Sequence, residues 1–385
     1  MSPEAKGQTN GKDAKDMQEF KLTVASSPHV RCNETIPKIM WNVVAALVPA
    51  AAFGVYYFGV NALVNIIVAI VSAVVFEFLW EKLMHKRVTI TDGSAVITGL
   101  LLAMCCPPSL PWWMSIVGSF LAIVVCKQAM GGLGYNIFNP AHVGRAGLMV
   151  SWPIAMTTWT QLNGTVVDGV AGATPLNVFK HGGTDALFNL FGTNDWGTIY
   201  QSLFFGFRNG SLGETSTVLL ILGGLWLIYK GYINWQVPVI MIATVGILMG
   251  AIYGSANVAL FEMMAGGLII GAFFMATDMV TAPITLKGQM IFALGCGLIT
   301  VLIRTLGGYP EGVCYSILLM NTLTPLIDRL VKPTVFGAVK KGAKKNGRQK
   351  RKRDLQGCDE PCPHLPGFRL YHRRCLLHYR PDRYG

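Results

Sequence analysis

Residues 61–80 read NALVNIIVAIVSAVVFEFLW, and this stretch decides the fold class of the chain. Glu77 is its one charged residue, and a strongly charged segment from Glu81 to Arg87 follows it. A helix needs about 20 mostly apolar residues to cross the hydrocarbon core of a bilayer. The stretch therefore predicts a membrane-spanning helix that ends in water near Glu81.

The rest of the chain repeats this pattern. Hydrophobic residues make up 52% of the 385 residues and charged residues only 14%, whereas soluble chains carry about a quarter charged residues. Gly, Pro and charge separate nine further apolar stretches, so we predict an all-α polytopic membrane protein with about ten transmembrane helices. The nine stretches are residues 38–58, 93–106, 111–127, 140–156, 214–230, 235–254, 257–276, 287–303 and 312–330.

The ten stretches divide into two halves of five, residues 38–156 and 214–332. Because five is odd, corresponding helices of the two halves point in opposite directions, which predicts a 5+5 inverted repeat. Gly246, Gly250 and Gly254 are spaced four apart and favour close approach of a neighbouring helix. The remaining parts are an N-terminal arm (1–37), a long polar loop (157–213) and a basic tail (333–385), which we expect to be disordered.

Lys and Arg predict the orientation of the chain. With a cytoplasmic N-terminus, the loops holding Lys82, Lys127, Lys230, Lys287 and Arg329 all lie inside, as the positive-inside rule requires. Both termini are then cytoplasmic, and loop 157–213 is extracytoplasmic. The net charge of +12 is explained by these loops and the tail, so no nucleic-acid partner is expected. The N-terminus shows no cleavable signal peptide.

Polar residues near the spans are the first candidates for a site. Burying a polar or charged side chain near a membrane span costs free energy unless the side chain is paired or lines a cavity. We therefore expect one of these two arrangements for Asn136, Asn139 and Arg145. The glycines at 131–134 resemble a phosphate loop, but no strand precedes them, which favours a tight re-entrant turn.

Four acidic residues lie in or at the ends of the spans. For Glu77 we expect a helix-end carboxylate at headgroup depth, and for Glu214 a carboxylate at a helix start, where the dipole favours it. Asp278 is the better candidate for a cavity-lining ion-path residue, and Glu262 is a weaker one. Six cysteines near the spans show no C-x-x-C pair, so they predict buried thiols rather than a disulfide or metal site.

The sequence DGVAGATPL at residues 168–176 lies in the long polar loop. Gly172 and Ala173 leave the backbone before Thr174 unshielded, and Pro175 fixes the exit of the turn. On its own this pattern predicts only a surface turn with an accessible Thr174 hydroxyl.

Several motifs together resemble the D subunits of Rnf complexes, over residues 20–335. They are LTVASSPH (22–29), TDGSA (91–95), GGLGYNIFNP (131–140), DGVAGATPL (168–176) and SLGETS (211–216). The related B subunits of Na⁺-translocating NADH:quinone oxidoreductases share the Gly-Ala-Thr segment and the NPAHVGR pattern at 139–145.

The resemblance implies a urea-transporter-like fold and a specific chemistry. It implies FMN joined to Thr174 through a phosphoester by a separate flavin transferase, with Asp168, Gly172 and Ala173 as the attachment motif. Asn136, Asn139, Arg145 and Glu214 are further cofactor-binding candidates. There is room for a second, noncovalent flavin such as riboflavin. No metal site is expected in the chain.

The implied activity is that of a bacterial inner-membrane electron relay in a Na⁺- or H⁺-translocating ferredoxin:NAD⁺ oxidoreductase. The chain is then not catalytic alone, and needs a flavin-bearing G-type subunit and iron–sulfur subunits as partners. Trp152, Trp159 and Phe179 are candidates to stack on the flavin, or else interfacial anchors. Two alternatives stay open: a B-type subunit of a quinone-reducing Na⁺ pump, and a flavin-free channel or transporter for a small solute.

Overall fold

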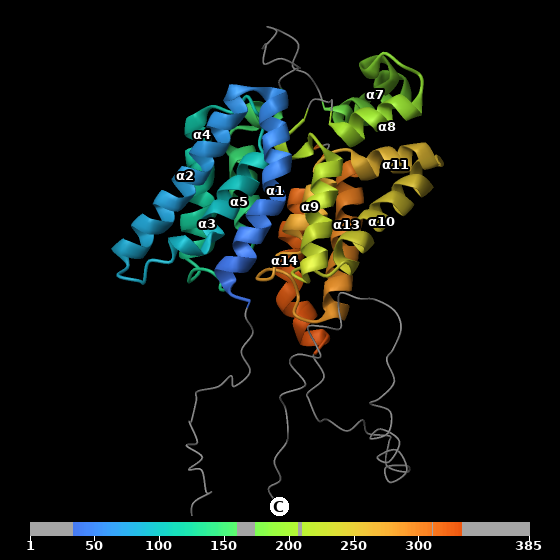
Figure 1. Cartoon of the computed structure of the whole chain (residues 1–385). Coiled ribbons are helices and arrows are strands. Elements are labelled where there is room, and N and C mark those ends of the chain that lie inside the picture. The colour runs from blue at the N-terminus through green and yellow to red at the C-terminus, as the bar shows by residue number, and fades with distance from the viewer. Residues whose placement is uncertain (1–33, 160–173, 207–209, 310, 333–385) are drawn as a thin grey trace, which may run out of the picture. The chain divides into compact units, whose positions relative to one another are not determined.

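The computed structural model describes residues 34–159, 174–206, 210–309 and 311–332, in which helices joined by turns are the regular secondary structure and no strand occurs (Figure 1). Three parts of the sequence predictions lie outside the described residues: residues 1–33 of the predicted arm, the motif residues Asp168, Gly172 and Ala173, and the tail from residue 333. Each of the ten predicted stretches is helical. The first half contains α1 (Ile36–Phe58), α2 (Val60–Leu83), α3 (Ser94–Met104), α4 (Trp112–Phe120) and α5 (Pro140–Ser151).

The second half contains six helices for five predicted stretches. They are α9 (Thr217–Lys230), α10 (Gln236–Tyr253), α11 (Ala256–Met264), α12 (Leu268–Ile270), α13 (Leu286–Leu306) and α14 (Val313–Leu330). Four of the described helices, α1, α2, α10 and α13, are long and apolar enough to span a membrane, and α11 with residues 268–275 makes a bent fifth candidate. The helices α3 and α9 are apolar but shorter. The chain is therefore an all-α, multi-pass membrane protein.

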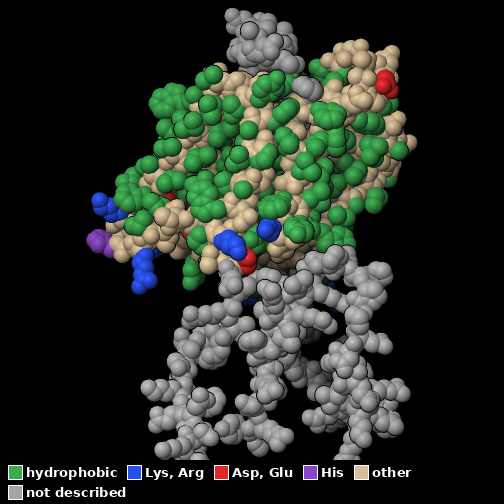
Figure 2. Space-filling view, in the orientation of Figure 1, with side chains coloured by type: hydrophobic (Ala, Val, Ile, Leu, Met, Phe, Trp, Pro, Cys, Tyr) green, Lys and Arg blue, Asp and Glu red, His purple; other side chains and the backbone are tan. Residues whose placement is uncertain are grey.

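The side chains on the outer flanks suit lipid contact. Along α2, Val64, Ile67, Val71 and Val75 are each 42–54% exposed. Figure 2 shows hydrophobic side chains over the flank of the bundle in this view, with Lys and Arg gathered at one end. An exposed apolar surface of this extent is expected where the solvent is a bilayer rather than water.

The helix packing agrees with the predicted inverted repeat. In the first half α2 packs on α3 and α4, and in the second half α10 packs on α11 and α13. Helices α1 and α9 join the halves, and they are antiparallel. Tyr232, just after α9, donates a hydrogen bond to Glu34, just before α1 (2.9 Å), while Gly54 near the end of α1 lies against Leu212, ahead of α9.

The predicted eighth span is not one continuous helix. Its two helices meet at a bend of 65°. Gly266 has a φ of 69°, in the left-handed region, and so ends α11 at this point. The sequence pattern did not reveal the break because both sides of it are equally apolar.

Loop 157–213 is also more structured than predicted. It contains α7 (Pro175–Phe191) and α8 (Trp196–Phe205), and α6 (Pro153–Thr157) leads into it. Phe179, Leu187, Ile199 and Leu203 pack with Phe261 of α11 in a separate apolar cluster. The small-residue prediction is confirmed at Gly246, where a Cβ would collide with Met263 Sδ, whereas Gly254 caps the end of α10.

Candidate functional site: two buried polar clusters and the Thr174 helix start

A tight turn places the first site residues. Gly131, Gly132 and Gly134 all have φ between 95° and 129°, so the segment folds back sharply, as the re-entrant-turn interpretation predicted. Asn139 then begins α5: its side-chain oxygen accepts hydrogen bonds from the backbone N–H groups of Ala141 (3.1 Å) and His142 (3.4 Å). This N-cap fixes Asn139 in the wall of a pocket.

Two π-helical segments face the same region. Residues Leu121–Gln128 (η2) continue α4, and Gly271–Met275 (η4) continues α12. Each ends in a backbone bond that reaches five residues back, from Ala129 to Val124 and from Ala276 to Gly271. Such π segments are rare and frequently occur at functional sites.

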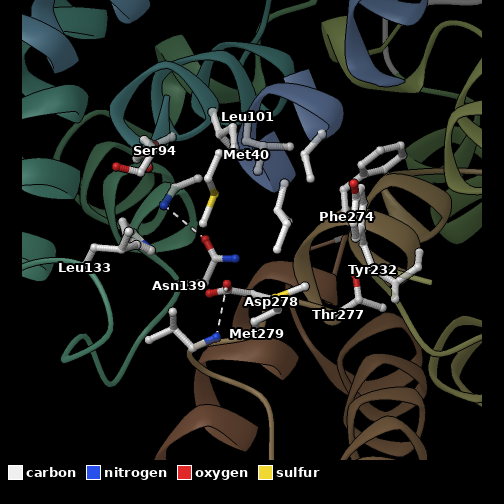
Figure 3. Close-up of a pocket in the computed structure, with 18 of the residues that line it drawn as sticks. Met40, Ser94, Leu101, Leu133, Asn139, Tyr232, Phe274, Thr277, Asp278 and Met279 are labelled. Atoms are coloured by element: carbon white, nitrogen blue, oxygen red, sulfur yellow. Dashed lines mark hydrogen bonds between the residues drawn. The ribbon is translucent and has the colours of Figure 1, made fainter. Parts of the chain in front are cut away.

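The pocket between these elements, here called the Asp278 pocket, has about 840 Å³ of open space, solvent included. Its walls are mainly apolar, and Figure 3 shows Asn139 and Asp278 close together, with Tyr232, Phe274 and Thr277 along one side. Asn136 also lines the pocket and is only 5% exposed. Its Oδ1 has no hydrogen-bond partner among the described residues. A buried, unpaired acceptor in a pocket is suited to a ligand that carries a donor.

Lys127 of η2 also lines the pocket and is fully buried. Its ammonium donates to both Glu77 oxygens (2.7 and 3.0 Å) and to Ser94 Oγ (2.7 Å). Two sequence predictions were therefore wrong. Glu77 is not a helix-end carboxylate at headgroup depth, and Lys127 is not a loop residue, because each neutralises the other inside the protein.

A second buried ion pair lies in the other half. Arg304 of α13 donates to Glu262 Oε2 (2.7 Å), and it also donates to the backbone oxygens of Glu262 and Ala265. The break after α11 leaves these two carbonyl oxygens without the backbone N–H partners that a following helical turn would supply. Arg304 therefore donates the hydrogen bonds that they would otherwise lack. Lys127 and Arg304 each lie near the end of the fourth helical stretch of its half.

A third ion pair connects the halves. Arg145 of α5 pairs with Glu311, which precedes α14, and this confirms that Arg145 is paired. Glu311 also hydrogen-bonds the Glu214 side chain, and Ser211 donates to Glu214 (2.9 Å). Sequence reasoning missed Glu311, although a buried Arg145 required an acidic partner somewhere in the chain.

Glu214 does not lie in the first turn of the sixth span, where the sequence had placed it. Glu214 is 3% exposed and ends a short 3₁₀ turn, Leu212–Glu214, ahead of α9. Ser216 caps α9 instead, through its side-chain oxygen and the N–H of Leu219. Asn136, Asn139 and Asp278 are thus brought together in one pocket, whereas Arg145 and Glu214 belong to the junction between the halves.

Thr174 lies immediately before α7 and is its N-cap. Its Oγ1 accepts a hydrogen bond from the N–H of Asn177 (3.2 Å), and Pro175 is the first helical residue. Thr174 is only 2% exposed, so the predicted accessible hydroxyl is instead covered. The sequence pattern was interpreted as a free turn because it did not reveal the helix that follows.

The three stacking candidates have different surroundings. Phe179 is 4% exposed and packs against Tyr253 and Phe261, with ring centroids 5.3 Å apart in both pairs. Its role is therefore packing of α7. Trp152 packs edge-on against Trp113, and Trp159 is buried.

The prediction of buried thiols is confirmed for the described cysteines. Cys105, Cys106, Cys126, Cys296 and Cys314 are all free and buried. No group of three His, Cys, Asp or Glu side chains suited to a metal ion occurs within the ranges that the structure describes.

These features define a class: a multi-pass helical membrane protein of two packed halves, with a mainly apolar pocket that a few polar side chains also line, and a buried charge pair in each half. The chain belongs to the NQR2, RnfD, RnfE family, which it matches over residues 23–337. This confirms the family that the sequence motifs indicated.

The similarity extends to curated relatives over nearly their whole length. The chain is 61% identical to the D subunit of the proton-translocating ferredoxin:NAD⁺ oxidoreductase complex of Clostridium ljungdahlii, over 82% of this chain and 96% of that protein. It is 45% identical to the D subunit of the Na⁺-translocating ferredoxin:NAD⁺ oxidoreductase complex of Acetobacterium woodii, over 84% and 98%. It is 37% identical to the D subunit of the ion-translocating oxidoreductase complex of Stutzerimonas stutzeri, over 80% and 94%.

Proposed function

We propose that this chain is the D-type subunit of an ion-translocating ferredoxin:NAD⁺ oxidoreductase, and that it relays electrons through FMN esterified to Thr174. The observation that carries the proposal is the sequence DGVAGATPL at 168–176 in a chain of this family, with its Thr174 as the N-cap of α7. Asp168, Gly172 and Ala173 are assigned to recognition by the flavin transferase.

The position of Thr174 suits a phosphoester. The first N–H groups of a helix lack intrahelical partners and carry partial positive charge, so they favour a phosphate. The first turn of α7 contains no acidic residue that would oppose it. Esterification replaces only the hydroxyl hydrogen, and Oγ1 can still accept from Asn177. FMN supplies reversible electron transfer, while the protein orients the ring and tunes its potential.

Lys180 holds this helix in place. Its ammonium donates to three backbone oxygens at the end of α13, those of Ile303, Gly307 and Tyr309. Near the start of α7, Leu176 lies against Gly266, at the break after α11. The proposed flavin-bearing residue is therefore fixed to the membrane-embedded part rather than carried on a free loop.

The Asp278 pocket favours a second, noncovalent flavin, and we assign riboflavin to it. Its apolar walls suit a flat aromatic ring, and the unpaired Asn136 oxygen could accept from a ring N–H. Asn139 and Lys127 also line this pocket, but their polar groups are bonded within the protein, so the free acceptor offered to the ring is that of Asn136. Arg145 and Glu214 are not assigned to either flavin, because they pair with Glu311 and Ser211.

The setting of the relay follows from the Lys and Arg distribution. We place the chain in the bacterial cytoplasmic membrane, with both termini inside and Thr174 outside. Partners are the flavin-bearing G-type subunit, the iron–sulfur subunits and the membrane lipid. Each charge moved across the membrane is worth about 2.3 kcal/mol per 100 mV, so electron steps here can be coupled to H⁺ or Na⁺ movement.

The test is flavin fluorescence of the denatured chain on a gel, after production together with the flavin transferase. The wild-type band is expected to fluoresce under ultraviolet light and the Thr174→Ala band to be dark. Thr158→Ala is the matched control, and its band should stay bright. A dark wild-type band, or a bright Thr174→Ala band, would refute the assignment and favour a solute channel or transporter. Quinone reduction by the assembled complex would instead favour the B-type subunit.

A further inference from the structure

A second, more polar pocket adjoins the Asp278 pocket and is here called the vestibule. It lies between the turn joining α9 to α10 and the segment 277–289, with about 690 Å³ of open space, solvent included. Asn234 donates to Gln289 Oε1 (2.7 Å) in its wall, and Gln289 donates to the Pro283 oxygen (3.0 Å). Hydrogen-bonding groups of this kind are suited to holding water.

The two pockets share one boundary. Tyr232, Ile233, Thr277, Asp278 and Met279 line both of them. Among the described residues that line either pocket, Asp278 is the one carboxylate. A proton that passes from water in the vestibule to a ligand in the Asp278 pocket therefore meets this side chain at the boundary.

Local hydrogen bonds orient the carboxyl group. Oδ1 accepts from the N–H of Val280 (3.3 Å), and Oδ2 accepts from the Thr281 hydroxyl (3.1 Å). Thr281 is 2% exposed, and its backbone oxygen accepts from Thr324 of α14 (3.0 Å). The carboxyl group is thus attached to the bundle and does not move with a free loop.

The charged and titratable groups around Asp278 come from η2 and from the segment after α9. Lys127 lies in η2, and its ammonium is bonded to Glu77 of α2. The Cys126 thiol of η2 and the Tyr232 hydroxyl after α9 complete the set, and Tyr232 is bonded to Glu34. Lys127 is therefore neutralised by its own partner, so Asp278 is free to exchange a proton without breaking an ion pair.

We propose that Asp278 transfers protons between water in the vestibule and the ligand of the Asp278 pocket. The proposal rests on the assignment of a flavin to that pocket. When the flavin accepts an electron from reduced FMN on Thr174, a ring nitrogen also takes up a proton. The Asp278 O–H bond breaks as the N–H bond forms, and water in the vestibule returns a proton to the carboxylate.

The first test asks whether water reaches the boundary, and it does not depend on any flavin. Thr277→Cys and Ala282→Cys in the assembled complex are treated with a charged, membrane-impermeant maleimide. Both are expected to gain label over the parent complex. Ala272→Cys, at a fully buried position, is the matched control and should gain none. If neither Thr277→Cys nor Ala282→Cys gains label, the vestibule is closed to solvent and the proposal is overturned.

The second test follows flavin reduction in the assembled complex by rapid-mixing absorbance across pH. Asp278→Asn is expected to slow the proton-coupled step by about 10²-fold, the size typical of a positioned acid, and to abolish its pH dependence. Asp278→Glu keeps a carboxyl group and should restore both. An unchanged rate and pH profile in Asp278→Asn overturns the proposal.

Failure of the underlying flavin assignment is recognised separately. Acid extraction of the wild-type complex should release one noncovalent flavin for this chain, and Asn136→Leu should reduce its retention. A wild-type complex without that flavin overturns the assignment and the proton transfer together. In that case labelling at Thr277→Cys would still report a water-filled vestibule.

Discussion

The Arg304–Glu262 pair allows a stability prediction that separates two roles of one side chain. Arg304 neutralises a buried carboxylate and also donates to two carbonyls at the broken end of α11. Arg304→Met removes all three interactions and leaves Glu262 as an uncompensated charge, 2% exposed. Breaking a buried pair in this way costs about 3–5 kcal/mol.

Glu262→Met should be milder, because Arg304 keeps its two carbonyl acceptors. In the double variant Arg304→Met/Glu262→Met no charge is left, so the charge penalty disappears. The two carbonyls still lack donors, and each unsatisfied buried group costs about 1–3 kcal/mol. The double variant should therefore lie between wild type and Arg304→Met, about 2 kcal/mol or more below wild type.

The assay is equilibrium unfolding in mixed micelles, titrated with a denaturing detergent, for the wild type, both single variants and the double variant. The four values form a double-mutant cycle, and we expect a favourable coupling energy between the two residues. Full recovery of stability in the double variant would refute the argument that Arg304 stabilises the helix break. Equal losses in Arg304→Met and Glu262→Met would refute it as well.

Two further predictions concern a helix crossing and a helix cap. Gly99→Val should destabilise the protein by about 1–3 kcal/mol in the same assay, because even a Cβ at Gly99 would lie 2.7 Å from the Ala69 oxygen of α2. Gly308 lies in open space, so Gly308→Ala should leave the stability unchanged. A larger loss of stability in Gly308→Ala than in Gly99→Val would contradict the structure. Asp195 caps α8 by accepting hydrogen bonds from the N–H groups of Gly197 and Thr198, and these bonds hold the pKa of Asp195 below its usual range. The stabilisation by the cap is therefore fully present above the usual pKa of an aspartate and is lost as the pH falls through the lowered pKa. Hydrogen exchange should show faster relative opening of those two N–H groups in acid, whereas Asp195→Asn, which caps without titrating, should show no such pH dependence.

The apolar stretches predicted all ten helical regions, because a helix that crosses a bilayer needs about 20 consecutive apolar residues. This requirement can be recognised from the residues of each stretch alone. The break at Gly266 could not be predicted in this way, because α11 and the segment that follows it are both apolar and together have the composition of one continuous span. What ends the helix is a left-handed glycine, stabilised by an arginine about 40 residues further along the chain.

The site residues show the same division. Burying a polar group near a span costs free energy, which predicts Asn136, Asn139 and Asp278 as site residues, and the structure places all three in one pocket. Their meeting could not be derived, since Asn136 and Asp278 come from different halves. The prediction that Glu77 and Lys127 lie outside the core was wrong, because a lone charge in a span gives no sign of a partner 50 residues away.

The sequence alone determined the class of protein, the helical stretches and the family, and it singled out Thr174 as the residue proposed to carry FMN. These features depend on local composition and on short patterns of neighbouring residues. Only the tertiary structure decided which charges are paired, where α11 breaks, that Thr174 caps a helix, and that Asp278 separates two pockets. Those features depend on contacts between distant segments, whose free energies are set by burial and electrostatics after the two halves have packed together.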